Sequence, residues 1–213
     1  MTNTINTLDD IVQEAKSFES PVTVLLCGVG GQGTILAADL LAQTAMAAGL
    51  QVKLAEVHGM AQRGGAVTTI VRFGKQVASM VTDPGCADYV VAFETTEALR
   101  NLPYLKSGGN LLVSKETIKP LSVLAGNAKM PKNAEGDLLS RGATIIPAVE
   151  LAVDAGNIKC SNVVLLGALA RVLGISPALW EEQIEKRLPQ KIVEVNKKSF
   201  HAGFSYEDNS SKG

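Results

Sequence analysis

Cysteine is scarce in this chain of 213 residues, and its scarcity excludes one class of site. The three cysteines, Cys27, Cys86 and Cys160, lie far apart, and none belongs to a Cys-x-x-Cys pair. A thiolate zinc site or an iron–sulfur cluster needs several cysteine ligands, so this chain alone does not build one. We therefore expect the metal centre of any redox reaction to lie on another polypeptide.

An excess of charge and a long apolar run are also missing. Twenty basic residues stand against 21 acidic ones, so no net positive field attracts a nucleic acid. No stretch reaches about 18 uninterrupted apolar residues, and the first 20 residues lack the basic and apolar regions of a signal peptide. We expect a cytoplasmic protein that binds neither nucleic acid nor a membrane.

The residues that are abundant indicate an α/β protein. Apolar residues make up 46% of the chain, only 4% are aromatic, and 20 glycines punctuate the apolar runs. Hydrophobic patterning predicts strands over 22–27, 51–57, 66–73, 88–93, 110–114 and 143–146, with a hairpin return over 76–81 and a turn at 107–109. Helices are predicted over 34–48, 95–105, 148–155, 162–173, 177–188 and 191–202.

This order predicts a Rossmann-like fold: a mostly parallel sheet with helices on both faces and a helical C-terminal region. Residues 115–142 are broken by proline and glycine, so we interpret them as a loop or lobe with short pieces of structure. We expect an N-terminal extension (1–21), one domain (22–204) and a polar tail (205–213).

A glycine-rich motif follows the first predicted strand and opens the first predicted helix. It comprises Gly28, Gly30, Gly31, Gln32 and Gly33, within the pattern G-x-G-x-x-G. Glycines let the backbone approach a ligand closely, and a helix N-terminus offers free N–H groups to a phosphate or carboxylate. Glu56, at the end of the second strand, has the place of a ribose-binding acid in a dinucleotide site. The glycines equally suit tight packing of strand and helix with no ligand.

A second polar segment lies between two apolar strands. Its candidate binding residues are Glu56, His58, Gly59, Gln62, Arg63, Gly64 and Gly65. An imidazole such as that of His58 can move protons, and a guanidinium such as that of Arg63 can bind a carboxylate or phosphate with two hydrogen bonds. The plainer interpretations are a loop histidine without chemistry and a surface ion pair. Cys27, inside the first strand, is expected to be a packed core residue.

The two segments together carry a family resemblance. GVGGQGTILAADLLAQTAMAAG, EVHGMAQRGGAVTTIVRFG, FETTEALR, NVVLLGALARVLG and NKKSFHAGF resemble the gamma subunit or domain of the 2-oxoacid:ferredoxin oxidoreductases, over about residues 22 to 204. Within that family, EVHGMAQRGG is similar to the small beta subunit of the indolepyruvate enzymes. Relatives acting on pyruvate or 2-oxoglutarate typically carry a tyrosine-glycine-proline version of this loop.

The resemblance implies an accessory subunit that has no catalytic residue of its own. A large partner subunit would hold thiamine diphosphate, magnesium and iron–sulfur clusters, oxidise an aryl 2-oxoacid, reduce ferredoxin and transfer the acyl group to coenzyme A. This chain would bind no cofactor and no metal, and its two polar segments would border the acyl-transfer site or hold the partner.

Three alternatives stay open at this point. The chain could be the gamma subunit of a related pyruvate or 2-oxoglutarate enzyme. It could be a stand-alone NAD(P)-binding reductase, with Gly28, Gly30 and Gly33 on the pyrophosphate and Glu56 on the ribose. It could also be an interaction module whose glycines serve packing alone.

Overall fold

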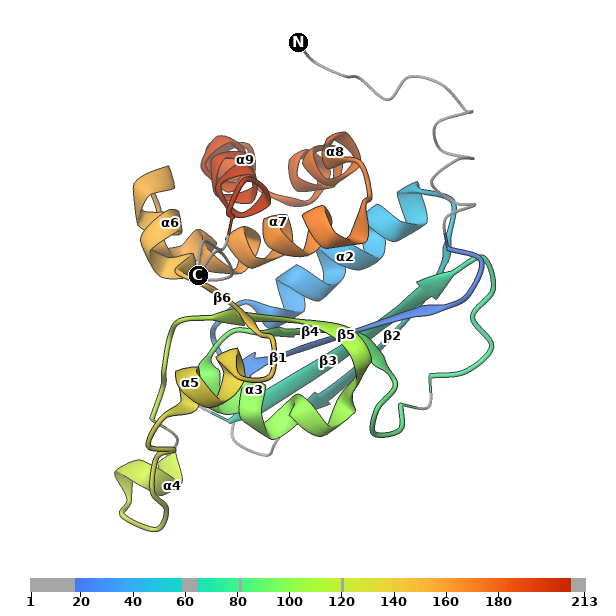
Figure 1. Cartoon of the computed structure of the whole chain (residues 1–213). Helices are drawn as coiled ribbons and strands as arrows, with labels where there is room; N and C mark the ends of the chain where they lie inside the picture. Colours follow the sequence, from blue (N-terminus) through green and yellow to red (C-terminus); the bar gives the residue numbers. More distant parts are fainter. Residues whose placement is uncertain (1–17, 59–64, 81, 120, 208–213) are drawn as a thin grey trace.

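The computed structural model describes residues 18–58, 65–80, 82–119 and 121–207, which form a six-stranded sheet with helices on both faces (Figure 1). The strands are β1 (Val22–Val29), β2 (Gln51–His58), β3 (Ala66–Gly74), β4 (Ala87–Ala92), β5 (Leu105–Ser114) and β6 (Thr144–Ile146). The helices are α2 (Thr34–Ala47), α3 (Thr95–Asn101), α4 (Leu121–Leu124), α5 (Ala134–Leu139), α6 (Ala148–Ala155), α7 (Ser161–Leu173), α8 (Pro177–Arg187) and α9 (Gln190–Phe204). Single 3-10 turns cover Leu102–Tyr104 and Ile158–Cys160.

The strand order is β2-β3-β1-β4-β5-β6. β3 pairs antiparallel with both β2 and β1, whereas β1, β4, β5 and β6 pair in parallel. β2 therefore runs in the same direction as β1, and β3 alone among these strands runs against the others. The predicted α/β architecture, with a mostly parallel sheet and helices on both faces, is confirmed.

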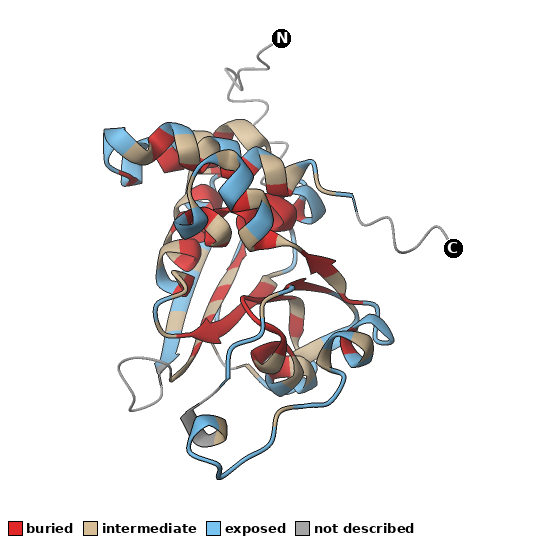
Figure 2. Cartoon of the chain, turned by 90° about the vertical axis from the view of Figure 1, so that its left-hand side faces the viewer, coloured by how far each residue is buried: buried red, intermediate tan, exposed pale blue. Residues whose placement is uncertain are grey.

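β1 lies at the centre of the sheet and is buried on both faces. Val24 and Leu26 face the cluster under α2 and α7, while Leu25 and Cys27 face the cluster under α3. Such two-sided burial explains why this strand reads as a continuous apolar run without alternation. Figure 2 shows this red, buried centre between the two helical layers.

The thicker helical layer comprises α2 and α6 to α9, and α3 and α5 cover the other face (Figure 1). α7 and α9 cross closely because each has a glycine at the crossing. A Cβ on Gly167 would lie 2.0 Å from the carbonyl oxygen of Phe200, and one on Gly203 would lie 1.8 Å from that of Val164. Any larger residue would force the two helix backbones apart.

The predicted hairpin return over 76–81 is wrong for residues 76–80, which form no strand; residue 81 lies outside the described residues. The chain here must cross from β3 to β4, which lies on the far side of β1. Side chains of β2 hold this segment instead. The Val77 N–H donates to Gln51 Oε1 at 3.2 Å, and Lys53 Nζ donates to the Ala78 carbonyl at 2.8 Å.

Two other boundaries differ from prediction. The helix expected over 95–105 ends at Asn101, and a 3-10 turn follows, because Pro103 has no N–H to continue the α-helical ladder. The turn expected at 107–109 lies inside β5, where Gly108 has φ 76° and the pairing with β4 shifts register. Residues 115–142 contain only the short helices α4 and α5 among their described residues, as the proline and glycine content predicts.

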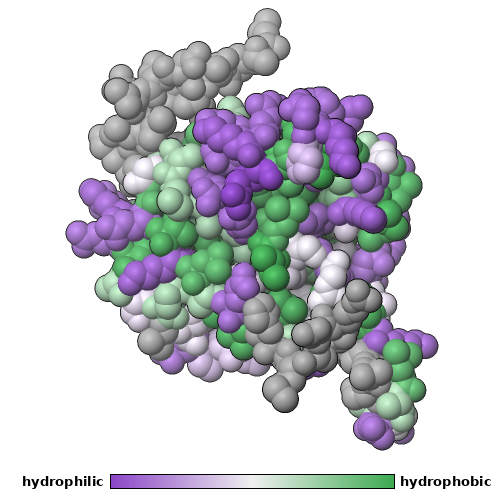
Figure 3. Space-filling model, turned by 180° about the vertical axis from the view of Figure 1, so that it is seen from behind, coloured by the Kyte–Doolittle hydropathy of each residue, from purple (hydrophilic) through white to green (hydrophobic). Residues whose placement is uncertain are grey.

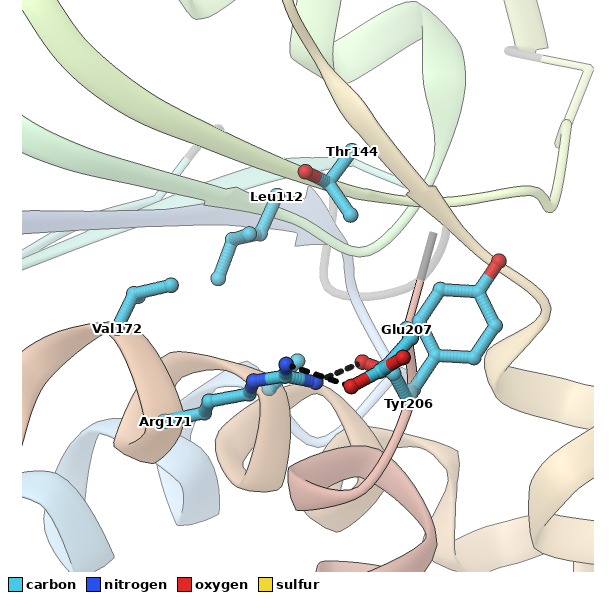
Figure 4. Close-up of a pocket in the computed structure, with 7 residues that line it drawn as sticks. Leu112, Thr144, Arg171, Val172, Tyr206 and Glu207 are labelled. Atoms are coloured by element: carbon cyan, nitrogen blue, oxygen red, sulfur yellow. Dashed lines mark hydrogen bonds and ion pairs between the residues drawn. The ribbon is translucent and has the colours of Figure 1, made fainter. Parts of the chain in front are cut away.

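The C-terminal segment packs against the body as far as Glu207. The Tyr206 hydroxyl donates to the Ile145 carbonyl of β6 at 3.0 Å. Arg171 of α7 donates to the Tyr206 carbonyl at 2.6 Å and forms an ion pair with Glu207 at 3.3 Å (Figure 4). These contacts border a cavity of about 270 Å³ that is also lined by Leu112 and Thr144. The first part of the predicted polar tail is therefore attached to the edge of the sheet.

Among the described residues, no helix has the length and apolar content needed to cross a bilayer.

Candidate functional site

The glycine loop between β1 and α2 owes its shape to three different glycines. Gly31 and Gly33 have φ 102° and φ 79°, a left-handed conformation that strongly favours glycine. Gly28 serves packing, since a Cβ there would lie 2.9 Å from the Cβ of Phe93. Steric needs therefore account for these three glycines before any ligand is considered.

Gln32 holds this loop against the neighbouring strand. Its Oε1 accepts the Val29 N–H at 2.8 Å, and its Nε2 donates to the Phe93 carbonyl at 2.9 Å. One side-chain amide therefore joins the carboxyl ends of β1 and β4. Both ends of that amide are engaged within the chain, which identifies Gln32 as a positioning residue.

The structure joins the two predicted polar segments at one point. The Gly30 N–H donates to the Gly65 carbonyl at 3.0 Å, just beyond the pairing of Val29 with Ala66. The backbone of His58 ends β2 opposite Val67. Gly59, Gln62, Arg63 and Gly64, the other predicted members of this segment, lie outside the described residues. Both segments therefore lie at the end of the sheet where β1 and β2 finish and β3 begins.

Glu56 lies apart from the glycine loop. In a dinucleotide site, the strand bearing the ribose-binding acid is the neighbour of β1, whereas here β3 lies between β1 and β2. Two strand spacings of about 4.8 Å each therefore separate the backbones of β1 and β2. Glu56 lines a different groove, on the β2 side of α2.

A groove of about 600 Å³ opens at the carboxyl ends of the parallel strands, beside the glycine loop. In open α/β sheets, ligands bind at this edge of the sheet. The groove lies at the N-termini of both α2 and α7, whose free N–H groups and dipoles favour an anion. Its lining comprises Gly31, Gln32, Gly33, Leu36, Glu116, Ile118, Val149, Ile158, Lys159, Ser161 and Asn162.

Asn162 connects the two sides of this groove. It lies in the first turn of α7, is 3% exposed, and donates through Nδ2 to the Gly33 carbonyl at 3.3 Å. A Cβ on Gly33 would lie 2.6 Å from the same nitrogen, so the close approach again requires glycine. The N-terminus of α7 is thereby held next to that of α2.

A buried glutamate lies at the carboxyl ends of the central parallel strands. Glu94, 1% exposed, caps α3 by accepting the N–H groups of Thr96 and Glu97, and it also accepts the Ile118 N–H at 3.3 Å. It therefore ties the end of β4 to the segment after β5. Gln32 and Glu94 together brace three successive parallel strands at their carboxyl ends.

Burial disfavours the charged forms of two groups near Glu94, the thiol of Cys27 and the carboxyl of Glu97. Burial raises the pKa of the Cys27 thiol well above its usual value, and the carboxylates of Glu97 and Glu94 raise it further. The Cys27 thiol donates to the Glu97 carbonyl at 3.6 Å. Burial also raises the pKa of Glu97, while Arg100 opposes this shift. Cys27 is a packed core residue, as the sequence predicts.

The described residues do not fit a metal or iron–sulfur centre. No group of three or more His, Cys, Asp or Glu side chains among them could hold a metal ion. Cys27 and Cys160 lie in separate core clusters, on opposite faces of the sheet. These two cysteines therefore cannot both ligate one iron–sulfur centre.

Sequence reasoning missed Glu94 and Asn162. For Glu94 a local signal exists: an acidic residue at the end of a buried strand, followed by Thr95, Thr96 and Glu97, is typical of a capped helix start. For Asn162 there is no local signal, because its partner Gly33 lies 129 residues away along the chain.

Comparison with known proteins identifies the family of this chain. The fold is that of the α/β gamma subunits of 2-oxoacid:ferredoxin oxidoreductases. The family model described as pyruvate ferredoxin/flavodoxin oxidoreductase matches residues 23–206, and the chain belongs to that family.

Individual relatives indicate which subunits within this family the chain resembles. The chain is 40% identical over 190 residues to "Indolepyruvate oxidoreductase subunit IorB" of Thermococcus kodakarensis, covering 84% of this chain and 93% of the relative. It is 28% identical over 188 residues to "Pyruvate synthase subunit PorC" of Thermotoga maritima, covering 83% and 90%. The predicted resemblance to the gamma-subunit family, with the indolepyruvate type as the nearer branch, is confirmed.

Solved structures share the fold. The gamma subunit of a keto/oxoacid ferredoxin oxidoreductase from Geobacter sulfurreducens superposes with a TM-score of 0.64 at 28% identity, covering 86% of this chain and 96% of that one. The 2-oxoglutarate:ferredoxin oxidoreductase of Magnetococcus marinus superposes with a TM-score of 0.68 at 20% identity, and covers 87% of this chain but only 31% of its own. The same fold therefore also occurs as one part of a much longer chain.

Proposed function

We propose that this chain is the small accessory subunit of an indolepyruvate (arylpyruvate):ferredoxin oxidoreductase. The complex would remove CO₂ from the 2-oxoacid, pass two electrons to two molecules of ferredoxin, and join the acyl group to coenzyme A as a thioester. Thiamine diphosphate, magnesium and iron–sulfur clusters would belong to the large partner subunit and supply the decarboxylation and electron transfer. The observation that carries this proposal is the 40% identity to an indolepyruvate oxidoreductase subunit over nearly its full length.

The site supports a wall-forming role for this chain. The glycine loop is braced by Gln32 and Asn162, and it is bonded at Gly30 to the end of the EVHGMAQRGG segment. A rigid loop with helix N-termini behind it suits a surface next to which an anionic substrate or cofactor passes. We propose that this loop and residues 56–65 border the acyl-transfer site or hold the partner subunit.

Co-expression with the large subunit tests the proposal. The purified complex is expected to reduce a viologen dye with indolepyruvate only when coenzyme A is present, at a rate well above that of the large subunit alone. Pyruvate and 2-ketoisovalerate in place of indolepyruvate distinguish the related gamma-subunit function. No gain over the large subunit alone, with any of these 2-oxoacids, would contradict the proposal.

The variant Arg63→Ala tests whether the Arg63 side chain contributes to the activity of the complex. The substitution is expected to lower the activity of the complex about tenfold or more, because one guanidinium that binds a carboxylate or phosphate contributes a charge-assisted hydrogen-bond pair. The thermal midpoint of the isolated chain should stay within about 2 °C of wild type. A large drop in that midpoint would make Arg63 a structural residue instead.

A dinucleotide-dependent reductase is less well supported. The acid at Glu56 lies on a strand that does not neighbour β1, so the pyrophosphate and ribose partners of a Rossmann site are not brought together. Calorimetric titration with NAD and NADP is expected to give no binding heat at millimolar concentrations.

A further inference from the structure

A lobe projects from the body of the molecule between β5 and α5. It comprises residues 117–133, contains the short helix α4, and is described except for residue 120. Figures 1 and 2 show α4 apart from both helical layers, and in Figure 2 the lobe is mostly pale blue. In Figure 3 it stands clear of the body at the lower right, with both hydrophilic and hydrophobic side chains on its surface. Packing within the chain therefore does not account for its composition.

Both ends of this lysine lobe, as we call residues 117–133, are fixed to the body. At its start, the Ile118 N–H donates to the buried carboxylate of Glu94 at 3.3 Å. At its end, the Asn133 side chain caps α5 by accepting the Gly136 N–H at 3.3 Å. Between them the chain reverses at Gly126, whose φ of 77° lies in the left-handed region. The lobe is therefore an extension with an anchored base.

The lobe carries positive charge of one kind only. Between Glu116 and Glu135 the sequence has three lysines and no acidic residue. Lys119, Lys129 and Lys132 are all exposed, and none forms an ion pair or a side-chain hydrogen bond with a described residue. The whole chain has a net charge of −1, so this local excess is not a general property of its surface. Three unpaired ammonium groups on a projecting segment attract an acidic surface.

An exposed leucine among these lysines indicates that the acidic surface belongs to a protein. Leu124, the last residue of α4, is 67% exposed. An apolar contact surrounded by charges is the usual arrangement of a protein interface. The lobe has no arginine and no aromatic residue for contacts with nucleic-acid bases. A helix that lies on a membrane presents a long apolar face, whereas α4 has only four residues.

The base of the lobe belongs to the candidate site. Glu116 and Ile118, on either side of its first residue, line the groove beside the glycine loop. The lobe therefore leaves the body at the carboxyl ends of the parallel strands, where that groove opens. A protein that covers the groove lies next to the lobe, so one partner can contact both.

We infer that the lysine lobe is a docking arm for the large subunit. The arm places Lys119, Lys129 and Lys132 against an acidic surface of that subunit and buries Leu124 in an apolar contact within it. This inference rests on the proposed function. Charge complementarity accelerates the encounter and fixes the orientation of the two proteins, and the buried leucine adds apolar contact area.

Two double variants with the same change in charge test the electrostatic part. Lys129→Glu/Lys132→Glu reverses two charges in the lobe, and Lys191→Glu/Lys198→Glu reverses two exposed lysines of α9. Each chain is co-expressed with the large subunit. The apparent Kd of each purified complex is then measured by sedimentation of a dilution series, at about 50 mM and about 500 mM NaCl, where the Debye length differs about threefold.

The lobe variant is expected to raise the apparent Kd at least about tenfold at low salt and much less at high salt, because salt screens exposed charges. The α9 variant should stay close to wild type at both concentrations. Equal Kd values for wild type and the lobe variant at low salt would overturn the inference. Equal weakening by both variants would also overturn it, because net charge alone would then explain the effect.

Leu124→Ala tests the apolar part, with Met46→Ala as its control. Met46 is 56% exposed near the end of α2, far from the carboxyl ends of the strands. Leu124→Ala is expected to raise the apparent Kd about fivefold at both salt concentrations, because burial of apolar area is not screened. Met46→Ala should have no effect. Equal Kd values for the two variants would overturn the apolar contact.

A measurement on the wild-type complex does not depend on any variant. Acetylation of the intact complex, followed by mass spectrometry, should modify Lys129 and Lys132 at least about fivefold more slowly than Lys191 and Lys198. All four are exposed in the chain itself, so a difference in rate reports cover by the partner. Equal rates in an active complex would overturn the docking arm and leave the proposed function standing.

Two further outcomes separate the occupants of the lobe. If Lys129→Glu/Lys132→Glu assembles like wild type and reduces viologen normally but reduces ferredoxin poorly, then the acidic partner is ferredoxin, and the inference is overturned. Failure of the wild-type chain to associate with the large subunit, or an assembled complex that oxidises none of the 2-oxoacids, would instead overturn the proposed function.

Discussion

The two edges of the sheet are built in opposite ways. β6 is three residues long and is followed directly by Pro147. The Ile146 carbonyl faces β5, where it accepts the Lys115 N–H at 2.9 Å, so the Ile145 carbonyl faces outward, and Tyr206 donates to it. β2 is eight residues long, and its edge has no comparable cover among the described residues.

This difference separates what the chain stabilises alone from what it leaves for a partner. The β6 edge is closed by residues from the C-terminal end of the same chain. The β2 edge leaves Leu54 and Val57 exposed, whereas its other side chains include Gln51, Lys53 and Glu56. Exposed apolar side chains on an edge strand are a feature that a partner often covers, and this chain is proposed to function as a subunit of a complex.

The largest expected effect comes from the crossing that supports the closed edge. Gly203→Ala would place a methyl group against the Val164 carbonyl, where the nearest atoms are backbone and cannot rotate away. We expect a loss of about 3 kcal/mol in the free energy of unfolding, because overpacking here must separate α7 from α9. For a chain of this size the thermal midpoint should fall by roughly 10 °C.

Lys198→Ala, on the exposed face of the same helix, serves as the control for Gly203→Ala. It should leave the midpoint nearly unchanged, within about 0.5 kcal/mol of wild type. If both variants melt like the wild-type protein, then the closed edge does not depend on the α7–α9 crossing, and the contrast between the two edges loses its structural basis.

A smaller effect is expected between the edges, at the glycine loop. Gln32→Ala removes both hydrogen bonds that join β1 to β4 and leaves the Val29 N–H and the Phe93 carbonyl without that partner. We expect a cost of about 2 kcal/mol in chemical denaturation. The same truncation at Gln43, half-buried on α2, should cost less than about 0.5 kcal/mol. Equal losses at both positions would contradict the bracing role of Gln32.

Local patterns in the sequence predict most of this fold. The apolar run before Gly28 and the aliphatic spacing after Gly33 identify β1, the tight turn and α2, because those signals lie within one short segment. The helices after Pro147 are predicted for the same reason. Errors fall where the fold brings distant segments together. The insertion of β3 between β1 and β2 is a property of the whole sheet, and no local pattern encodes it.

For the candidate site, too, the sequence predicts the local features and misses the long-range contacts. The sequence motif identifies the glycine loop and its helix, and the family resemblance pairs this loop with the 56–65 segment. The motif does not reveal that Gly33 approaches Asn162 or that Glu94 bonds to the segment after β5. Both contacts depend on helix packing over long separations. Glu56 is the converse case, since its spacing suggests a ribose partner and the strand order places it in another groove.

The smallest expected effect sharpens the comparison at the closed edge itself. Tyr206→Phe keeps the ring and removes only the hydroxyl that donates to the outward carbonyl of Ile145. We expect a loss of about 1 kcal/mol, the net value of one hydrogen bond, measured by chemical denaturation. Tyr104→Phe, the same change in the 3-10 turn after α3, is the matched control.

Removal of that hydroxyl should also make the β6 edge resemble the β2 edge in one respect. The Tyr206→Phe chain is expected to self-associate more than wild type at high concentration in sedimentation, because an unpaired outward carbonyl becomes available to another molecule. With only three residues in β6, the increase should stay small. If Tyr206→Phe matches Tyr104→Phe in both stability and sedimentation, strand length and Pro147 alone protect this edge, and the tyrosine merely packs there.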